Sequence, residues 1–348
     1  MGNRLSLPDR PKPPPPSSSP SPSPSPQALT KVTIFGAGIT GMAIATLLPK
    51  TCAITIVARD LPGDAPSQGW ASPWACAGWA ALGGTPREQA MQLDALAWYR
   101  AVAAAHPEAG VRRVGMTDLG VAADAWFHGR VPGLREVDGG VGYESAVLDP
   151  GVFLPWLRRV LEEQGVKFVR VGTVRSLGEL AYLGGHVLVN ASGLASLTLK
   201  DVRDDAVVMD RTYTALVKSD YRDAFVRRGK TEYSYYFGRG DGTAVLGGIS
   251  EPVDSVVRTV AEVRADLIRR AHENLPDFFP STRPEDYTFV RDHVGIRPLR
   301  PESVRVEREV VDGQRVIHAY GTTIGGYMLS FGLAREVARL LDEYLFEM

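Results

Sequence analysis

A glycine-rich turn between a strand-like run and an apolar run most constrains what this chain can fold into. Residues 31–35 are mostly β-branched or aromatic, which favours a β-strand. Residues 36–41, Gly-Ala-Gly-Ile-Thr-Gly, follow directly and lead into the apolar run 42–48, which ends before Pro49. The G-x-G-x-x-G spacing between a strand and a helix predicts a dinucleotide-binding unit.

Each glycine of this turn has its own physical role. Gly36 permits the tight turn, Gly38 lets the backbone approach a pyrophosphate, and Gly41 lets the helix pack on the strand. The N-terminus of the helix then offers free N–H groups and a positive dipole end to the phosphates. The other residues of the predicted phosphate-binding turn are Ala37, Ile39 and Thr40.

A second strand is expected over residues 53–57, and it ends at an Arg-Asp pair. Asp60 lies 19 residues beyond Gly41, a position that suits a carboxylate holding a ribose hydroxyl. Arg59 favours a pyrophosphate contact or a 2′-phosphate, and a solvated loop pair is the alternative for both residues. The motif alone does not separate FAD from NAD.

Composition excludes several classes of protein. The 348 residues carry a net charge of −1, which argues against a nucleic-acid binder. The two cysteines, Cys52 and Cys76, exclude a disulfide framework and a Cys-rich metal site, and the six histidines show no metal-ligand spacing. No metal is therefore predicted. No apolar run is long enough for a transmembrane helix.

The N-terminal segment has a different composition from the rest. Residues 11–26 hold nine prolines and six serines, so we predict a disordered Pro/Ser-rich arm over 1–28. Gly2 fits the N-myristoylation pattern, which would give weak membrane contact; an unmodified tail is the simpler interpretation. The last residues, 345–348, lack the S-K-L peroxisomal signal, and a cytoplasmic location is expected.

Further along the chain, a series of motifs carries a family resemblance. Residues 67–79, Ser-Gln-Gly-Trp-Ala-Ser-Pro-Trp-Ala-Cys-Ala-Gly-Trp, resemble the segment that runs beside the flavin ring in fungal D-amino-acid oxidases. Matches to other segments of that family follow in order up to about residue 345. These later segments are 148–168, 186–194, 245–248, 294–307 and 318–327.

The resemblance implies an α/β fold with non-covalent FAD. A Rossmann-like FAD-binding domain is assembled from discontinuous segments, and a mostly β substrate domain accompanies it. The order of strand-like and helix-like patterns independently supports a split domain. We assign 29–80, 148–200 and 292–348 to the FAD-binding domain, and 81–147 and 201–291 to the substrate domain.

The family positions also imply a set of cofactor contacts. Cys76 stands where the fungal relatives usually have glycine; it could bond the flavin or act as a redox group, but a small buried residue is the simpler interpretation. The implied cofactor-binding residues beyond the first turn and Arg59 and Asp60 are Ser67, Gln68, Ala75, Cys76, Ala77, Gly78, Val169, Ser192, Gly193, Gly325, Gly326, Tyr327, Met328 and Ser330.

Substrate-binding residues follow from the same resemblance. Arg297 is the first arginine of G-x-R-P, the family's carboxylate anchor, and a guanidinium fork matches a carboxylate with two hydrogen bonds. A structural salt bridge is the alternative role. Counting back from the Gly-Gly pair at 247–248 favours Tyr236 as the hydroxyl that shares the carboxylate, with Tyr235 on the opposite strand face as the alternative. Gly326 is also expected at the substrate.

The implied reaction is FAD-dependent oxidative deamination of a D-amino acid. Hydride passes from the substrate Cα to flavin N5, and O2 reoxidises the flavin and yields hydrogen peroxide. The imino acid hydrolyses to a 2-oxo acid and ammonia. D-Aspartate is an alternative substrate, for which Arg239 could supply a second cation.

Two departures from the family pattern keep other functions open. Residues 211–213, Arg-Thr-Tyr, replace an R-G-Q segment, and residues 322–326 are one longer than the family's turn. These changes motivate a pathway-specific tailoring oxidase acting on a larger amine or amino acid. A non-catalytic flavin-binding interaction protein is the remaining alternative, and Arg297 argues against it. The sequence leaves the oligomeric state open.

Overall fold

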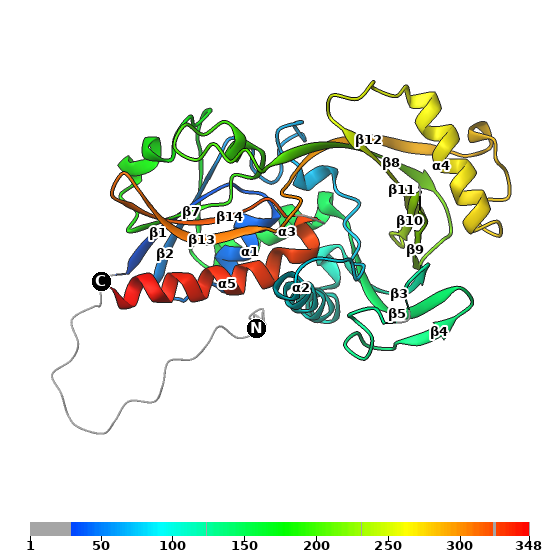
Figure 1. The fold of residues 1–348 in the computed structure, drawn as a ribbon, viewed down its shortest axis with the longest axis horizontal. Coiled ribbons are helices and arrows are strands. Elements are labelled where there is room, and N and C mark those ends of the chain that lie inside the picture. The colour runs from blue at the N-terminus through cyan, green and yellow to red at the C-terminus, as the bar shows by residue number, and fades with distance from the viewer. Residues whose placement is uncertain (1–28, 123, 231, 323–324, 348) are drawn as a thin grey trace.

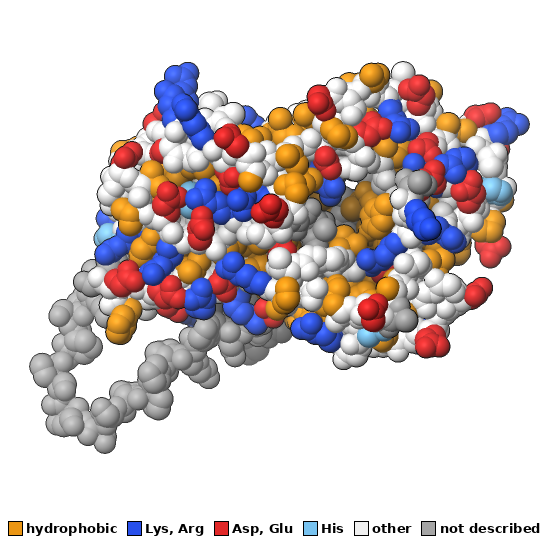
Figure 2. Space-filling view, viewed as in Figure 1, with side chains coloured by type: hydrophobic (Ala, Val, Ile, Leu, Met, Phe, Trp, Pro, Cys, Tyr) orange, Lys and Arg blue, Asp and Glu red, His pale blue; other side chains and the backbone are white. Residues whose placement is uncertain are grey.

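A computed structural model of the chain describes residues 29–122, 124–230, 232–322 and 325–347 (Figure 1). The predicted arm over 1–28, with Gly2, lies outside the described residues. Two β-sheets stand at opposite ends of the molecule, with helices α1, α2, α3 and α5 grouped around the first sheet and α4 on the second (Figure 1). On the face that Figure 2 shows, basic and acidic side chains are interspersed.

The first sheet is mostly parallel and contains the predicted opening strand. β1 pairs in parallel with β2 on one side and with β7 on the other, and β13 is the antiparallel edge. Its strands come from three separate stretches of the chain, as the prediction of a split domain requires. In sheet order they are β13 (Arg305–Val311), β14 (Gln314–Tyr320), β7 (Val187–Asn190), β1 (Thr30–Phe35), β2 (Cys52–Ala58) and β6 (Lys167–Arg170).

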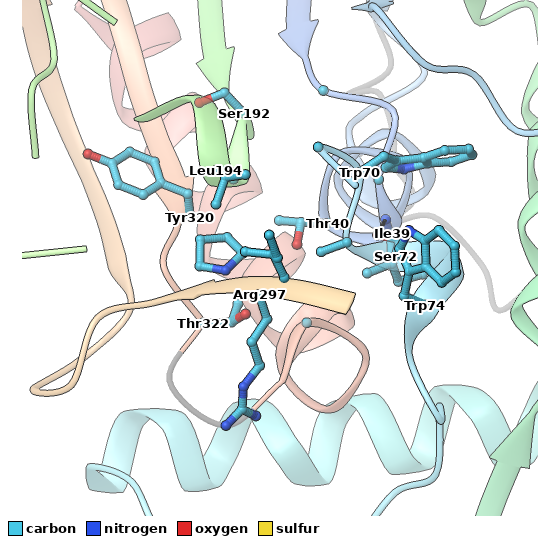
Figure 3. A pocket seen from close by; sticks show the side chains of 18 of the residues that line it. Ile39, Thr40, Trp70, Ser72, Trp74, Ser192, Leu194, Arg297, Tyr320 and Thr322 are labelled. Atoms are coloured by element: carbon cyan, nitrogen blue, oxygen red, sulfur yellow. Dashed lines mark hydrogen bonds between the residues drawn. The ribbon is translucent and has the colours of Figure 1, made fainter. Parts of the chain in front are cut away.

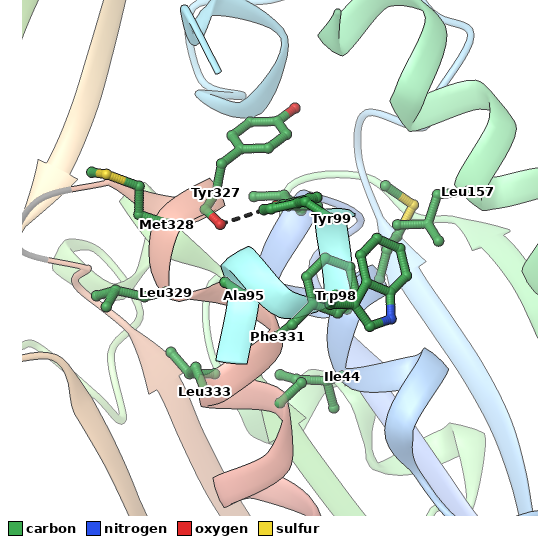
Figure 4. Packing of buried hydrophobic residues seen from close by; sticks show 14 of the residues in the cluster. Ile44, Ala95, Trp98, Tyr99, Leu157, Tyr327, Met328, Leu329, Phe331 and Leu333 are labelled. Atoms are coloured by element: carbon green, nitrogen blue, oxygen red, sulfur yellow. Dashed lines mark hydrogen bonds between the residues drawn. The ribbon is translucent and has the colours of Figure 1, made fainter. Parts of the chain in front are cut away.

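Four helices pack around this sheet. Helix α1 follows the glycine turn, and α3 begins after Asp149, whose side chain accepts the N–H of Gly151. Helices α2 and α5 cross closely: the rings of Trp98 and Phe331 stack with centroids 3.5 Å apart (Figure 4). The bounds are α1 (Ile39–Leu47), α2 (Pro86–Ala105), α3 (Pro150–Glu163) and α5 (Gly326–Phe346).

The second sheet is mostly antiparallel. Helix α4 (Val260–Asn274) covers one of its faces and, with that face, buries a cluster that includes Phe225, Tyr236 and Phe279. The other face turns toward the first sheet. In sheet order the strands are β12 (Phe289–Leu299), β8 (Val208–Lys218), β11 (Thr243–Pro252), β10 (Tyr233–Gly238), β9 (Ala224–Arg228), β3 (Val111–Leu119), β5 (Gly140–Leu148) and β4 (Arg135–Val137).

Short 3₁₀ turns complete the secondary structure and connect the longer elements. They are η1 (Ser72–Trp74), η2 (Pro107–Ala109), η3 (Leu177–Leu183), η4 (Gly193–Leu197) and η5 (Pro284–Asp286). The largest hydrophobic cluster joins the two halves, because it takes residues from β1, α1, α2, β3, β5, α3 and α5.

The predicted fold class is confirmed: the chain is α/β, with a parallel sheet flanked by helices and a second, β-rich unit. Two segments contact elements outside the domain to which the sequence assigns them. Residues 292–299 belong to β12, which pairs with β8 in the second sheet. Helix α2, assigned to the substrate domain, packs on α5 beside the first sheet.

Candidate active site

A cavity of about 740 Å³ lies where the two sheets meet. The ends of β1, β2 and β7 form one end of it, and β8 and β12 form the other (Figure 3). Its size falls in the range of small-molecule and cofactor sites. It lies at the carboxyl ends of the parallel strands, where open α/β sheets bind their ligands.

The glycine turn has the geometry predicted for it. Gly36 has a φ of +121°, and a Cβ there would lie 2.3 Å from the carbonyl oxygen of Ala191. A Cβ on Gly41 would lie 1.9 Å from the carbonyl oxygen of Gly36, so this glycine lets the helix pack on the strand. Gly38 caps α1 without a side-chain hydrogen bond, and the N–H of Ile39 donates to Ser72 Oγ at 3.0 Å. Gly38, Ile39 and Thr40, at the N-terminus of α1, line the cavity.

Buried polar atoms on the cavity wall lack partners and fit a polar ligand. Trp70 Nε1, Ser192 Oγ and Thr214 Oγ1 are buried and, among the described residues, have no hydrogen-bond partner. All three residues line the cavity. Buried polar groups are normally satisfied, so these atoms suit a bound molecule that has donors and acceptors along its length. A dinucleotide meets this requirement.

The Arg59–Asp60 pair marks the nucleotide end of the cavity. Both residues line it, and Arg59 Nε donates to Asp60 Oδ2 at 2.9 Å. The pair follows β2 directly, at the position where a ribose is held in this fold. Residues 172–174, just after β6, complete the wall at this end.

Most of the predicted site residues do line the cavity. From the first turn and the ribose end these are Gly36, Ala37, Gly38, Ile39, Thr40, Arg59 and Asp60. From the later segments they are Ala75, Cys76, Ala77, Gly78, Ser192, Gly193, Arg297, Gly325, Gly326, Tyr327 and Met328.

Five predicted cofactor residues lie behind the wall instead, and Gly41 of the first turn is one of them. Ser330 is buried on α5, and its hydroxyl donates to the Tyr327 carbonyl oxygen. Val169 packs into a hydrophobic cluster beside β2 and β7. The other two make hydrogen bonds that hold the segment 67–79 in place. Gln68 Nε2 donates to the Val294 carbonyl, and Ser67 Oγ accepts from Arg59.

Cys76 lines the cavity beside a tyrosine. Burial raises the pKa of its thiol above the usual value, and a hydrogen bond with Tyr235 opposes part of that shift. A raised pKa keeps the sulfur protonated at neutral pH, and the thiol is the less nucleophilic form. The geometry therefore suits the interpretation of Cys76 as a small wall residue.

Arg297 lines the cavity from β12, and its side chain points away from Ser192 and Tyr320 (Figure 3). Its Nη2 lies 3.3 Å from Asp210 Oδ2 on the paired strand, and its Nε is buried without a partner in the described part of the chain. The side chain is 39% exposed. An incoming carboxylate could therefore bond the free Nε–H and share Nη2 in one fork.

The expectation for Tyr236 needs correction, because the structure places it away from the cavity. Its ring is fully buried under α4, and Asn274 Nδ2 donates to its hydroxyl at 3.1 Å. Burial raises the pKa of Tyr236 to about 12. Tyr235, on the opposite face of β10, lines the cavity. Successive residues of a strand face opposite sides, so only one of the two tyrosines can line the cavity. Helix α4 covers the face that carries Tyr236, and counting residues back from the Gly-Gly pair could not reveal this.

A Gly-Gly pair explains how the Tyr235 ring fits. Tyr235 is opposite Gly247 in the β10–β11 pairing. A Cβ on Gly247 or on Gly248 would come within 2.2 Å of the Tyr235 ring. The ring therefore lies flat against backbone that only glycine leaves open.

The structure also explains the altered Arg-Thr-Tyr segment. Arg211 donates to the carbonyls of Val253 and Ser255, and Tyr213 is buried in the cluster under α4. Only Thr212 of the three lines the cavity. Arg239, considered as a second cation, is 7% exposed and pairs with Asp149 at 2.7 Å.

Several cavity residues went unpredicted. Three of them lie within the segment 67–79, so the family resemblance could have identified them: Trp70, Ser72 and Trp74. Thr214 follows Thr212 at the spacing of one strand face, a pattern visible in the sequence. Tyr320 also lies in a segment that carries the resemblance. Ala195 and Leu197 of η4 become wall residues through tertiary packing, and no local pattern marks them.

Comparison with known proteins agrees with the dinucleotide-binding site that the geometry indicates. A family model described as FAD dependent oxidoreductase matches residues 31–340. A D-amino-acid oxidase from Fusarium vanettenii is 26% identical, over 90% of this chain and 96% of its own length. A D-amino-acid oxidase from Streptomyces coelicolor is 32% identical over 72% of this chain and 78% of its own.

Two further similarities bear on substrate class and fold. A D-aspartate oxidase from Talaromyces thermophilus is 29% identical, over 89% of this chain and 95% of its own. Among solved structures, glycine oxidase from Geobacillus kaustophilus superposes with a TM-score of 0.70 at 17% identity, covering 90% of this chain and 95% of its own.

The fold and the cavity define an FAD-dependent oxidoreductase with a separate β-rich substrate unit. The chain belongs to the DAO family of FAD dependent oxidoreductases. FAD is its cofactor. In the described part of the chain, no helix is both long and apolar enough to cross a membrane. The described residues also contain no group of three or more His, Cys, Asp or Glu side chains placed to hold a metal ion.

Proposed function

We propose that this enzyme oxidatively deaminates a D-amino acid, with O2 as the electron acceptor. The observation that carries the proposal is Arg297, a partly exposed guanidinium that lines a dinucleotide cavity. When bound, FAD accepts the hydride from the substrate Cα and passes its electrons to O2. Amino acid, O2 and water become 2-oxo acid, ammonia and hydrogen peroxide.

The protein's share of this reaction is binding and orientation. Arg297 holds the α-carboxylate by a charge-assisted fork, which fixes the substrate Cα relative to the cofactor. Asp210 and Ser250 hold the guanidinium in place: Ser250 Oγ donates to Asp210 Oδ2 at 3.0 Å. Tyr235 also lines the cavity, and its hydroxyl is the neutral partner for the carboxylate.

Aromatic and small side chains exclude water around the substrate. Trp74, Tyr235 and Tyr327 line the cavity, and Cys76 and Met328 lie among them. A drier site strengthens the interaction between the guanidinium and a carboxylate. Burial also raises the pKa of Tyr235 and Tyr327 well above the usual value, so both keep their hydroxyl protons at physiological pH.

Substitution of Arg297 tests the proposal. Each hydrogen bond to a charged group contributes roughly 1.5–3 kcal/mol, so Arg297→Ala should lower kcat/KM for the best D-amino acid about a thousandfold. Arg297→Lys keeps the charge without the fork and should recover only part of that loss. Peroxide release and flavin content are measured together.

Arg222, an exposed residue just before β9 and outside the cavity lining, gives the matched control. Arg222→Ala removes the same charge and should leave kcat/KM unchanged. Near-normal kcat/KM for Arg297→Ala on the best D-amino acid would remove Arg297 from the site. Loss of flavin in that variant would instead assign Arg297 to the scaffold around the cofactor.

A further inference from the structure

The residue opposite the carboxylate anchor is itself a carboxylate. Asp210 on β8 is paired with Arg297 on β12, and residues opposite each other in antiparallel strands project from the same face. Thr212 and Thr214, two and four residues further along β8, line the cavity. Asp210 therefore projects from the same strand face as Thr212 and Thr214, beside the residues that line the cavity, and its Oδ2 lies 3.3 Å from Arg297 Nη2.

The cationic side chains near this end of the cavity already have ion-pair or hydrogen-bond partners. Among the described residues that line the cavity, the basic ones are Arg59 and Arg297, and Arg59 is paired with Asp60 at the nucleotide end. Arg239 is buried against Asp149 at 2.7 Å. Arg211 donates to two backbone carbonyls, those of Val253 and Ser255.

The charges of Arg297 and Asp210 therefore cancel before substrate arrives. The α-carboxylate of an amino acid neutralises the positive charge of Arg297. A second carboxylate on the substrate would find Asp210 nearby and no uncommitted guanidinium among the described residues. The two negative charges would repel each other. Because the Asp210 side chain is only 25% exposed, water screens this repulsion less than it would at a fully exposed site.

We propose that Asp210 is a specificity residue: it rejects acidic D-amino acids and favours those with neutral or cationic side chains. The proposal rests on the proposed function, because it concerns the side chain of the same substrate. In this proposal Asp210 both holds Arg297 in place and selects among substrate side chains by their charge. A brace would affect all amino acids alike, whereas a selecting charge changes the ratio between matched substrates.

Two matched substrate pairs isolate the charge. D-Aspartate and D-asparagine are close in shape and differ by one negative charge; D-lysine and D-norleucine differ by one positive charge. The kcat/KM ratio within each pair cancels any general effect on Arg297. Ratios are measured for the flavin-loaded wild type, for Asp210→Asn, and for Asp220→Asn, which removes the same charge from an exposed residue beyond the opposite end of β8.

The wild type should prefer D-asparagine to D-aspartate and accept D-lysine. Asp210→Asn should raise the aspartate-to-asparagine ratio about tenfold and lower the lysine-to-norleucine ratio, as removal of one nearby charge worth about 1.4 kcal/mol predicts. Asp220→Asn should leave both ratios unchanged. A wild type that prefers D-aspartate, or ratios unaffected by Asp210→Asn, would overturn the role of Asp210 and leave the proposed function standing. No turnover on any D-amino acid would remove both.

Discussion

At the residue scale, the alternation of side chains along β10 decides which tyrosine lines the cavity. Tyr235 and Tyr236 are neighbours with the same chemistry, yet one lines the cavity and the other is buried under α4. Arg297 could be identified from the sequence because its motif fixes both strand and face. The tyrosine could not, because loop length sets the register and α4 sets which face is covered.

Removing each tyrosine hydroxyl separately tests this assignment. Tyr235→Phe should lower kcat/KM for a D-amino acid about tenfold, the effect of losing one hydrogen bond to a charged group. Tyr236→Phe loses only its bond with Asn274, so it should reduce stability by about 1 kcal/mol and leave kcat/KM nearly unchanged. Steady-state kinetics and chemical unfolding measure the two effects. The opposite pattern would restore Tyr236 to the site.

At the scale of elements, the segments with regular patterns were predictable. The opening strand, the glycine turn and the second strand lie where the sequence places them. Helices α2 and α4 were not predicted, although each begins with a capping box, Thr85 with Glu88 and Thr259 with Glu262. Helix α2 contacts α5 as well as β3 and β5, so its apolar residues form no single stripe.

The close crossing of α2 and α5 predicts that an added methyl group on α5 lowers the stability of the protein. Gly332→Ala would normally stabilise a helix by about 0.5–1 kcal/mol. Here the added Cβ would lie 2.2 Å from Met91 Cα, so the two helix backbones must separate. Overpacking of this kind costs about 1–3 kcal/mol, and the Tm of the flavin-loaded protein should fall.

Asp342→Ala, on the exposed face of α5, is the matched control. It adds no contact with α2 and should change the Tm little. A Tm for Gly332→Ala equal to or above that of the wild type would contradict the close approach of the two helices.

At the scale of the whole molecule, the site exists only where separate parts of the chain meet. Residues from β1, η1, η4, β8 and β12 line one cavity. The family resemblance predicted this assembly, while local patterns predicted only its nucleotide end. Residues such as Tyr320 enter the wall because β14 lies beside β7 in the first sheet.

A buried histidine beside the substrate face links stability to pH. His293 on β12 is 6% exposed, and neither ring nitrogen has a partner among the described residues. Burial, with Arg239 and Arg291 nearby, lowers the pKa of His293 from 6.5 to about 4. The unfolded chain therefore binds a proton that the folded protein does not, so stability falls as the pH drops from about 6.5 toward 4.

His293→Gln cannot ionise and should lose less stability between pH 7.5 and pH 5. The wild type should lose about 1–2 kcal/mol more than the variant over this interval, since each pKa unit corresponds to about 1.4 kcal/mol. Urea unfolding at the two pH values measures the difference. An equal loss in both proteins would mean that His293 takes up its proton in the folded state.

The most direct test of the account is the anaerobic reaction of the flavin-loaded enzyme with single enantiomers of neutral amino acids. A D-amino acid should bleach the absorption band of the oxidised flavin, and its L-enantiomer should not. Readmitting O2 should restore the band and release one hydrogen peroxide per flavin, as transfer of one hydride to each cofactor requires. A flavin that no D-amino acid bleaches, or one that both enantiomers bleach equally, would contradict the assignment of this enzyme as a D-amino-acid oxidase.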